Sequence, residues 1–320
     1  MKPHVLFCPA GLAHTNGPSH PESPERLQTL STLFSRLASE GTVSLSSIPA
    51  GKDLSLYDGP HHRSYLDMLA SLNDSPRSPR RLDPDTAFSS ATMTAILSTA
   101  SALSLLIEAC RNEGGNFFLA ERPPGHHALP DRAMGFCIVN HAAALAWHLR
   151  RLHPESRIAV LDFDVHHGNG TEAILRGLGQ ILFISTHQYP FYPGTGSGRE
   201  NTDGRKGEGI LDIPLQEGTD DDWYRTILDE TVFPRLERFR PTFLIVSAGF
   251  DAHREDPLGG LLLTEEIYHE IGERLCTLGC PFIASVLEGG YNLSALSRSV
   301  EAYLRGLNGP DSSLSRFRQS

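Results

Sequence analysis

Short apolar segments alternate with longer, helix-length segments along this 320-residue chain, and the alternation limits its fold more than any other feature. The apolar segments are near-continuous hydrophobic runs, each bounded by glycine, proline or polar residues. They cover Val5–Cys8, Asn116–Ala120, Ile158–Asp162, Ile181–Ser185, Phe243–Ser247 and Pro281–Leu287. Runs that lack polar alternation predict strands buried on both faces, as in a parallel sheet.

Segments of helical length lie between these predicted strands. They cover Glu25–Leu37, Ala91–Arg111, Asn140–Arg151, Asp221–Phe239, Glu265–Leu278 and Ser294–Leu307. Strands that alternate with helices predict an α/β fold with a central, mostly parallel sheet flanked by helices. The sequence has no internal repeat, so we expect one domain over residues 1–307, followed by a flexible C-terminal tail at 308–320.

Bulk charge and apolar content exclude several classes of protein. The formal net charge is −10, which argues against unspecific binding to nucleic acid or anionic membranes, because both need a basic surface. The N-terminal apolar run is too short for a signal peptide, and no run approaches 18 consecutive apolar residues. The five cysteines form no CxxC pair. We therefore expect a cytoplasmic protein with no membrane or nucleic-acid partner.

Polar residues that can bind a ligand or take part in catalysis follow five of the predicted strands. They lie in the segments Arg122–His127, Asp162–Gly170, Thr186–His187, Ser247–Asp256 and Glu288–Tyr291. In an open α/β sheet the ligand site lies outside the carboxyl ends of the strands. The sequence therefore predicts a single site to which these segments contribute histidine, aspartate and tyrosine.

The densest of these clusters is Asp162-x-Asp164-x-His166. Alternation along an extended segment would place the three side chains on one side, where they can converge on a cation. Asp256, after a later strand, is the expected third hard ligand. Three protein ligands and an open position are typical of a catalytic zinc site. The alternative for such a motif alone is a solvated acidic turn that caps a helix.

The tandem histidines His126 and His127 follow a stiff Pro-Pro-Gly turn. Asp162 and Asn169 are available to orient one ring each, and such partners set the tautomer and the basicity of an imidazole. A metal-activated water beside a general base is sufficient for amide hydrolysis. Tyr291, after two glycines, can donate a hydrogen bond to the developing oxyanion, although a tyrosine packed at a helix start is the alternative.

Several motifs, in a fixed order, resemble the zinc-dependent histone deacetylase family, and more closely its class II and bacterial amidohydrolase branch. They span nearly the whole chain. They are HPESPERL (20–27), RPPGHHA (122–128), GFC (135–137), DFDVHHGNGT (162–171), YPGTGSG (192–198), SAGFDAHREDPLGG (247–260) and LEGGYN (288–292).

The resemblance implies the arginase/deacetylase fold, with a tunnel that ends at one zinc ion per chain. It implies that Asp164, His166 and Asp256 bind this zinc. His127 would be the general base and acid, His126 would support it through Asp162, and Tyr291 would stabilise the oxyanion. Further matched positions imply a tunnel wall, a product-exit arginine and a potassium site. These are Gly135, Phe136, His167, Tyr192 and Leu258 for the wall, Arg26 for the exit, and Asp162 and Ser185 for potassium.

The substrate that the resemblance implies is acetyl-lysine in proteins or peptides. Small acylated amines such as acetylpolyamines are an alternative, but Leu258 stands where polyamine-preferring members carry glutamate. A binuclear manganese ureohydrolase and an inactive ligand-binding homologue are further alternatives. Either Asp83 or Asp85 could grip the substrate backbone at the rim, and the oligomeric state stays open.

Overall fold

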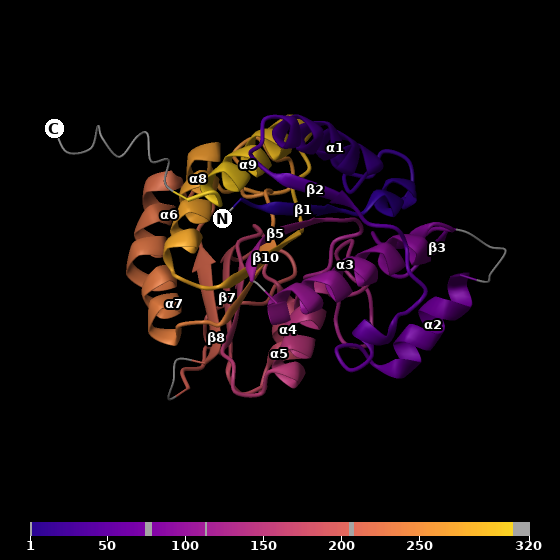
Figure 1. Cartoon of the computed structure of the whole chain (residues 1–320), viewed down its shortest axis with the longest axis horizontal. Coiled ribbons are helices and arrows are strands. Elements are labelled where there is room, and N and C mark those ends of the chain that lie inside the picture. Colours follow the sequence, from indigo (N-terminus) through magenta and orange to yellow (C-terminus); the bar gives the residue numbers. More distant parts are fainter. Residues whose placement is uncertain (1, 74–78, 113, 205–207, 310–320) are drawn as a thin grey trace.

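A computed structural model describes residues 2–73, 79–112, 114–204 and 208–309 of the chain. Its centre is an eight-stranded sheet in the order β2-β1-β5-β10-β9-β6-β7-β8, in which every pair of neighbouring strands is parallel (Figure 1). The strands are β1 (His4–Phe7), β2 (Ser44–Ser47), β5 (Gly115–Ala120), β6 (Ile158–Asp162), β7 (Ile181–Gln188), β8 (Gly209–Leu215), β9 (Phe243–Ala248) and β10 (Phe282–Leu287). A small antiparallel pair, β3 (Arg80–Arg81) and β4 (Ala87–Phe88), lies apart from it.

Helices cover both faces of the sheet, and each face has its own apolar core (Figure 1). Along β6, Ala159 and Leu161 belong to one core and Ile158 and Val160 to the other, because successive side chains in a strand point to opposite faces. The first core is covered by α1 (Pro24–Ser39), α6 (Asp221–Ile227), α7 (Phe233–Phe239), α8 (Glu265–Thr277) and α9 (Leu293–Gly306). The second is covered by α2 (Arg63–Asn73), α3 (Thr92–Asn112), α4 (His141–Leu152) and α5 (Asn169–Leu175).

The predicted α/β architecture with a central parallel sheet is confirmed, and all six predicted strands are present. Sequence reasoning missed the edge strands β2 and β8, because neither is a continuous buried run. All four residues of β2 are half-buried or exposed, and buried residues of β8 are interrupted by half-buried and exposed ones. The single helix expected over 221–239 is interrupted by a π-helical turn at Leu228–Val232. Pro234, which has no amide hydrogen to donate, follows this turn at the start of α7.

Helix α3 departs from the expectation that no segment is apolar enough to cross a membrane. By length and composition alone, Thr92–Arg111 would be sufficient. Within the domain, however, half of that stretch is buried, and residues such as Ile96, Leu103 and Leu106 pack into the second core. Its apolar character is therefore accounted for by packing against β5 and α4.

The predicted C-terminal tail begins at Asn308, and residues 310–320 of it lie outside the described residues. Asn308 is anchored, since its Nδ2 donates to the carbonyl oxygens of Thr42 at 3.1 Å and Leu304 at 3.2 Å. The division into a domain at 1–307 and a tail stays a prediction.

A buried carboxylate joins the first two motifs of the sequence. Glu22 is fully buried, and its oxygens accept hydrogen bonds from Asn16 at 2.9 Å, from Arg26 at 3.2 Å and from two nitrogens of Arg122. Burial raises the pKa of Glu22, but the two guanidinium groups outweigh it and lower the pKa from 4.5 to about 2. Glu22 is thus the shared counter-ion of two buried arginines beneath the carboxyl edge of the sheet, and its single negative charge offsets one of their two positive charges.

Replacing Glu22 with glutamine should destabilise the domain by roughly 3–5 kcal/mol, because Arg26 and Arg122 would keep buried charges without a counter-ion. Urea unfolding followed by circular dichroism measures the loss. Since the folded pKa of Glu22 is depressed, its stabilisation is present above about pH 4.5 and is lost as the pH falls towards 2. The matched control is Glu40→Gln, which removes an exposed partner of two arginines and should change stability much less. Equal losses in the two variants would contradict this account.

Candidate functional site

The candidate site lies at the carboxyl end of the sheet, where the segments after four strands meet. The segment after β5 contributes His126 and His127, and the end of β6 begins the cluster around Asp164. The segments after β9 and β10 contribute further carboxylates and a tyrosine, Tyr291. Because these strands are parallel neighbours in the sheet, side chains far apart in the sequence come together.

Three side chains form a group of possible metal donors. Nδ1 of His166 lies 3.0 Å from Oδ1 of Asp164 and 3.1 Å from Oδ2 of Asp251. One donor atom of each residue lies within 4.8 Å of the others. Two carboxylates and an imidazole at this spacing are a ligand set that zinc accepts. Both carboxylates are buried, so a cation between them would offset their mutual repulsion.

Gly289 closes one side of this group. Its amide donates to Oδ2 of Asp164 at 2.8 Å, and a Cβ atom at this position would collide with the carboxylates of both Asp251 and Asp164. Only glycine therefore allows the backbone after β10 to approach the two aspartates so closely.

The structure places a different aspartate in the donor group from the one the sequence suggested. Asp256 accepts hydrogen bonds from the backbone amides of Leu258 at 3.0 Å, Tyr291 at 2.6 Å and Asn292 at 3.1 Å. It fixes the backbone of the tyrosine, and its role as a metal ligand stays a prediction. Asp251, which sequence reasoning did not single out, stands three residues after the end of β9.

The tandem histidines have the two hydrogen-bond partners that the sequence suggested, and the structure shows which partner belongs to which ring. His126 donates from Nδ1 to Asp162 at 3.1 Å, and His127 donates from Nδ1 to Oδ1 of Asn169 at 2.8 Å. The two rings lie 4.0 Å apart. With Nδ1 protonated, Nε2 of His127 carries the free lone pair. Asp162 serves His126 and is not in the donor group, since β6 ends at Asp162 and the extended alternation stops there.

Electrostatics give the two histidines opposite protonation states. Burial lowers the pKa of His126, but the carboxylates of Asp164 and Asp162 raise it well above its usual value. For His127, burial and then the charges of His126 and His166 hold the pKa well below its usual value. These directions favour a charged His126 and a neutral His127 that can accept a proton.

A cavity of about 490 Å³ leads to these residues. Four of the five predicted wall residues line it: Gly135, Phe136, Tyr192 and Leu258. Gly135 has a φ of +56°, and a Cβ there would lie 2.5 Å from the ring of His127. The other lining residues are His127, His166 and Tyr291 together with Asp85, Gln188, Pro190, Phe191, Glu217, Pro257, Gly259 and Gly260.

The prediction that His167 lines the cavity is wrong: among the residues that the structure describes, His167 is not part of the cavity wall. Its Nδ1 lies 2.8 Å from Oγ1 of Thr195, and its Nε2 contacts Glu172 at 2.9 Å and Asp212 at 3.1 Å. Burial lowers its pKa, but these two carboxylates raise it to about 9. His167 points away from the cavity because a buried acidic pair holds it. Phe191, which stacks on His166 with ring centroids 5.3 Å apart, forms part of the wall.

Tyr291 lies between the cavity and Arg26. Its ring meets Phe136 edge to face at 5.7 Å, and the guanidinium carbon of Arg26 lies 5.0 Å from its centroid. Arg26 is fully buried and donates from Nε to the Gly290 carbonyl at 2.7 Å. Within the part of the chain that the structure describes, the Tyr291 hydroxyl has no hydrogen-bond partner. It is thus available to a ligand, and Arg26 lies beneath the site as expected.

At the rim, the structure distinguishes the two candidate aspartates. Asp83 is engaged with the backbone amides of Asp85, Thr86 and Gly135 at 2.9, 2.6 and 3.2 Å. Asp85 lines the cavity, and burial and the neighbouring Asp83 raise its pKa to about 6. Of these two aspartates, Asp85 is therefore the one that a ligand in the cavity would meet.

The predicted potassium site involves two residues that pair across β6 and β7. Asp162 and Ser185 stand opposite each other in the sheet, and Oγ of Ser185 lies 2.9 Å from Nδ1 of His187. The binding of potassium there stays a prediction.

Comparison with known proteins links this arrangement to a family. The sequence profile described as "Histone deacetylase domain" matches residues 20–307. A "Histone deacetylase-like amidohydrolase" of Pseudomonas aeruginosa is 36% identical over 269 residues, which cover 83% of this chain and 70% of that protein. A "Probable deacetylase" of Methanothermobacter thermautotrophicus is 42% identical over 261 residues, covering 81% and 77%.

Two further similarities extend over nearly the whole chain. "Histone deacetylase 10, chloroplastic" of Oryza sativa subsp. japonica is 34% identical over 340 residues, covering 98% of this chain and 75% of that protein. A solved structure described as the crystal structure of the HDA15 HD domain superposes with a TM-score of 0.86 at 30% identity. The match covers 98% of this chain and 91% of that one.

Proposed function

The chain belongs to the histone deacetylase domain family, and from this premise we propose that it is a zinc-dependent hydrolase that removes acetyl or other short acyl groups from lysine side chains of proteins or peptides. One observation carries the proposal. His127, whose Nδ1 bonds to Asn169, lies beside His166 of the donor group with ring centroids 5.7 Å apart, and both histidines line the cavity that Tyr291 also lines.

The metal would be held by Asp164, His166 and a third carboxylate. We propose Asp256 for this position, because its neighbours Pro257 and Leu258 line the cavity, whereas Asp251 is fully buried behind His166. When bound, zinc supplies Lewis acidity, which activates water and polarises a carbonyl group. Asp251 would then hold the segment after Asp164, since its Oδ1 accepts from the amide of Val165 at 2.9 Å.

The chain's own residues account for the proton transfers. His127 would take a proton at Nε2 from the attacking water as the new C–O bond forms, and it would return this proton to the nitrogen as the C–N bond breaks. The hydrogen bond from Nδ1 to Asn169 keeps Nε2 in the accepting tautomer. A charged His126 would stabilise negative charge on the reacting acyl group, and the carboxylates of Asp164 and Asp162 favour that charge by raising the pKa of His126.

The Tyr291 hydroxyl would donate a hydrogen bond to the carbonyl oxygen as that oxygen gains charge. Burial raises the pKa of Tyr291 well above its usual value, so the phenol keeps the proton that it needs as a donor. Arg26, beneath the tyrosine, supplies a buried positive charge that would attract the released carboxylate. We further propose that Asp162 and Ser185 bind potassium, and that the enzyme acts in the cytoplasm.

The cavity favours a thin aliphatic chain that ends in an amide. Phe136 and Tyr192 supply aromatic walls for methylene groups, and Leu258 adds an apolar side chain at the position where the resemblance places a glutamate in polyamine-preferring members. Asp85 can accept a hydrogen bond from the backbone of a peptide substrate. These walls support acyl-lysine peptides over acetylpolyamines, which remain the second candidate.

A panel of acyl-lysine peptides and acetylpolyamines, assayed side by side on the zinc-loaded protein, tests this choice. We expect the largest kcat/KM for a short acyl-lysine peptide. A larger kcat/KM for an acetylpolyamine would replace our substrate class with the second candidate. No turnover of any substrate and no binding of a hydroxamate would instead favour an inactive homologue.

Replacing Tyr291 with phenylalanine should lower kcat for the best peptide on the order of 100-fold, because the oxyanion loses its hydroxyl donor. The fold should be unchanged, since that hydroxyl makes no hydrogen bond within the described residues. Steady-state kinetics and a thermal unfolding curve measure the two effects. The control is Tyr192→Phe, which removes a hydroxyl from the cavity wall and should retain most of the activity. A wild-type kcat in Tyr291→Phe would exclude the assigned role.

A further inference from the structure

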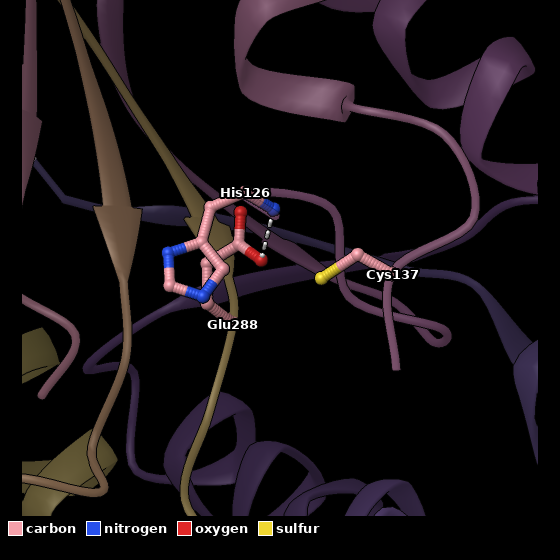
Figure 2. Close-up of side chains that lie close together, drawn as sticks. All are labelled: His126, Cys137 and Glu288. Atoms are coloured by element: carbon pink, nitrogen blue, oxygen red, sulfur yellow. Dashed lines mark hydrogen bonds between the residues drawn. The ribbon is translucent and has the colours of Figure 1, made fainter. Parts of the chain in front are cut away.

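Glu288 is a buried carboxyl group that the mechanism above leaves without a role. It follows β10 directly, and its side chain reaches the turn that carries the tandem histidines. Its Oε2 accepts from the backbone amides of Gly125 at 2.7 Å and His126 at 3.1 Å. Figure 2 shows the second of these hydrogen bonds, with the ring of His126 beside the carboxyl group.

The same short segment holds three other parts of the site. The carbonyl oxygen of Glu288 accepts from Arg26, Gly289 donates to Asp164, and the amide of Tyr291 donates to Asp256. The Glu288 side chain extends this set of contacts to the histidines. Through it, the segment after β10 fixes the histidine turn relative to the metal donors and the tyrosine.

The surroundings of Glu288 favour a neutral carboxyl group. Its side chain is fully buried, and no arginine or lysine side chain of the described residues forms an ion pair with it. The second oxygen of Glu288, Oε1, has no hydrogen-bond partner within the described structure. The two oxygens of Glu121, another buried carboxyl group, also lack a hydrogen-bond partner there. Burial raises the pKa of Glu288 to about 8. The charge of the His126 ring and the hydrogen bonds from the backbone amides of Gly125 and His126 act in the opposite direction but are outweighed.

Figure 2 also shows Cys137 near this carboxyl group, and His126, Cys137 and Glu288 each place a possible metal donor within 4.8 Å of the others. Burial raises the pKa of the Cys137 thiol well above its usual value, so the thiol stays protonated. Because the thiolate is the metal-binding form of cysteine, the group is better explained by positioning than by a second metal.

We propose that Glu288 is a positioning residue, whose side-chain oxygen Oε2 fixes the backbone of Gly125 and His126 and thereby the rings of His126 and His127. The proposal rests on the proposed function of these histidines. Its central claim is that the hydrogen-bond acceptor matters and the negative charge does not. A misplacement of a catalytic group by about 1 Å can cost on the order of 100-fold in rate.

Two substitutions separate the acceptor from the charge. Glu288→Gln keeps a carbonyl oxygen at the same distance from the backbone but cannot ionise. Glu288→Asp keeps an ionisable carboxyl group but withdraws the oxygen by about one methylene length. We expect Glu288→Gln to keep kcat within about threefold of wild type, and Glu288→Asp to lose at least tenfold in kcat with little change in KM.

Hydrogen–deuterium exchange of the peptide that spans residues 123–127 provides a readout that does not depend on activity. Exchange should be equally slow in the wild type and Glu288→Gln, and faster in Glu288→Asp, because the amides of Gly125 and His126 lose their acceptor. Zinc content, measured in all three proteins, should be equal. If the wild type hydrolyses none of the substrates, the proposed function fails, while the exchange experiment still decides the positioning.

The opposite order of the variants, with Glu288→Asp active and Glu288→Gln inactive, would overturn the proposal in favour of a required charge. Wild-type exchange and kcat in both variants would overturn it as well, because the acceptor would then be dispensable. If Glu288→Asp does not fold, Glu288→Gln decides alone. Retained kcat and slow exchange would support the proposal, and loss of either would refute it.

Discussion

Replacing Asp164 with asparagine should abolish both zinc binding and turnover. The wild type should retain about one zinc per chain after dialysis, and the variant should retain at least tenfold less. The reason is electrostatic, because the substitution removes one of the buried anions around His166 and leaves a weaker, neutral oxygen donor. Metal analysis by mass spectrometry measures the zinc, and release of acetate from an acetyl-lysine peptide measures the turnover.

Parallel variants identify the third carboxylate and locate the metal. Asp256→Asn should lose zinc as Asp164→Asn does, whereas Asp251→Asn should lose less. The reverse order would make Asp251 the ligand. Asp212→Asn is the control, because Asp212 belongs to a separate buried group with His167 and Glu172. If Asp212→Asn were folded and lost the zinc while Asp164→Asn kept it, our assignment of the metal site would be wrong. The zinc would then bind at the group of His167, Glu172 and Asp212.

Replacing His127 with alanine should lower kcat/KM by about 100-fold or more, because the reaction loses the neutral base that accepts the proton of water. That factor corresponds to about 2.7 kcal/mol of transition-state stabilisation. Zinc content should stay at the wild-type level, since His127 is outside the donor group. Steady-state kinetics with a short acyl-lysine peptide, together with metal analysis of the same preparation, separate the two effects.

The two histidines should differ in their contribution. His126→Ala should cost less than His127→Ala, because a charged His126 acts on the acyl group through its field and does not exchange the proton. His62→Ala, at an exposed position, is the control for the loss of an imidazole and should be fully active. A larger loss in His126→Ala than in His127→Ala would reverse the two roles.

Most of the fold was predictable because buried parallel strands have an unmistakable composition. A run such as Ile158–Asp162 is fully buried and was predicted to the residue. The edge strand Ser44–Ser47 was not, because only one side of each edge strand needs apolar residues and SLSS resembles a loop. The short helix α5 was also missed, because seven residues carry too little periodicity to be distinguished from a turn.

The sequence predicts which site residues come together where the order of the strands in the sheet determines it. It does not predict the contacts that depend on the local direction of a side chain or a loop. His126 and His127 reach Asp162 and Asn169 because their segments follow strands of one parallel sheet. The direction of His167 depends on Glu172 and Asp212, the latter on the missed strand β8, so its exclusion from the cavity could not be read from the motif. The contacts of Glu288 depend on a close approach of two loops, which leaves no periodic signal in the sequence.

The most direct test of the account is a zinc titration of the metal-free protein with hydrolysis of an acetyl-lysine peptide as the readout. We predict that acetate release rises in proportion to bound zinc and reaches its plateau at about one zinc per chain. Chelation should reverse the gain. A folded protein that binds one zinc and releases no acetate would contradict the account, as would activity that requires two metal ions per chain.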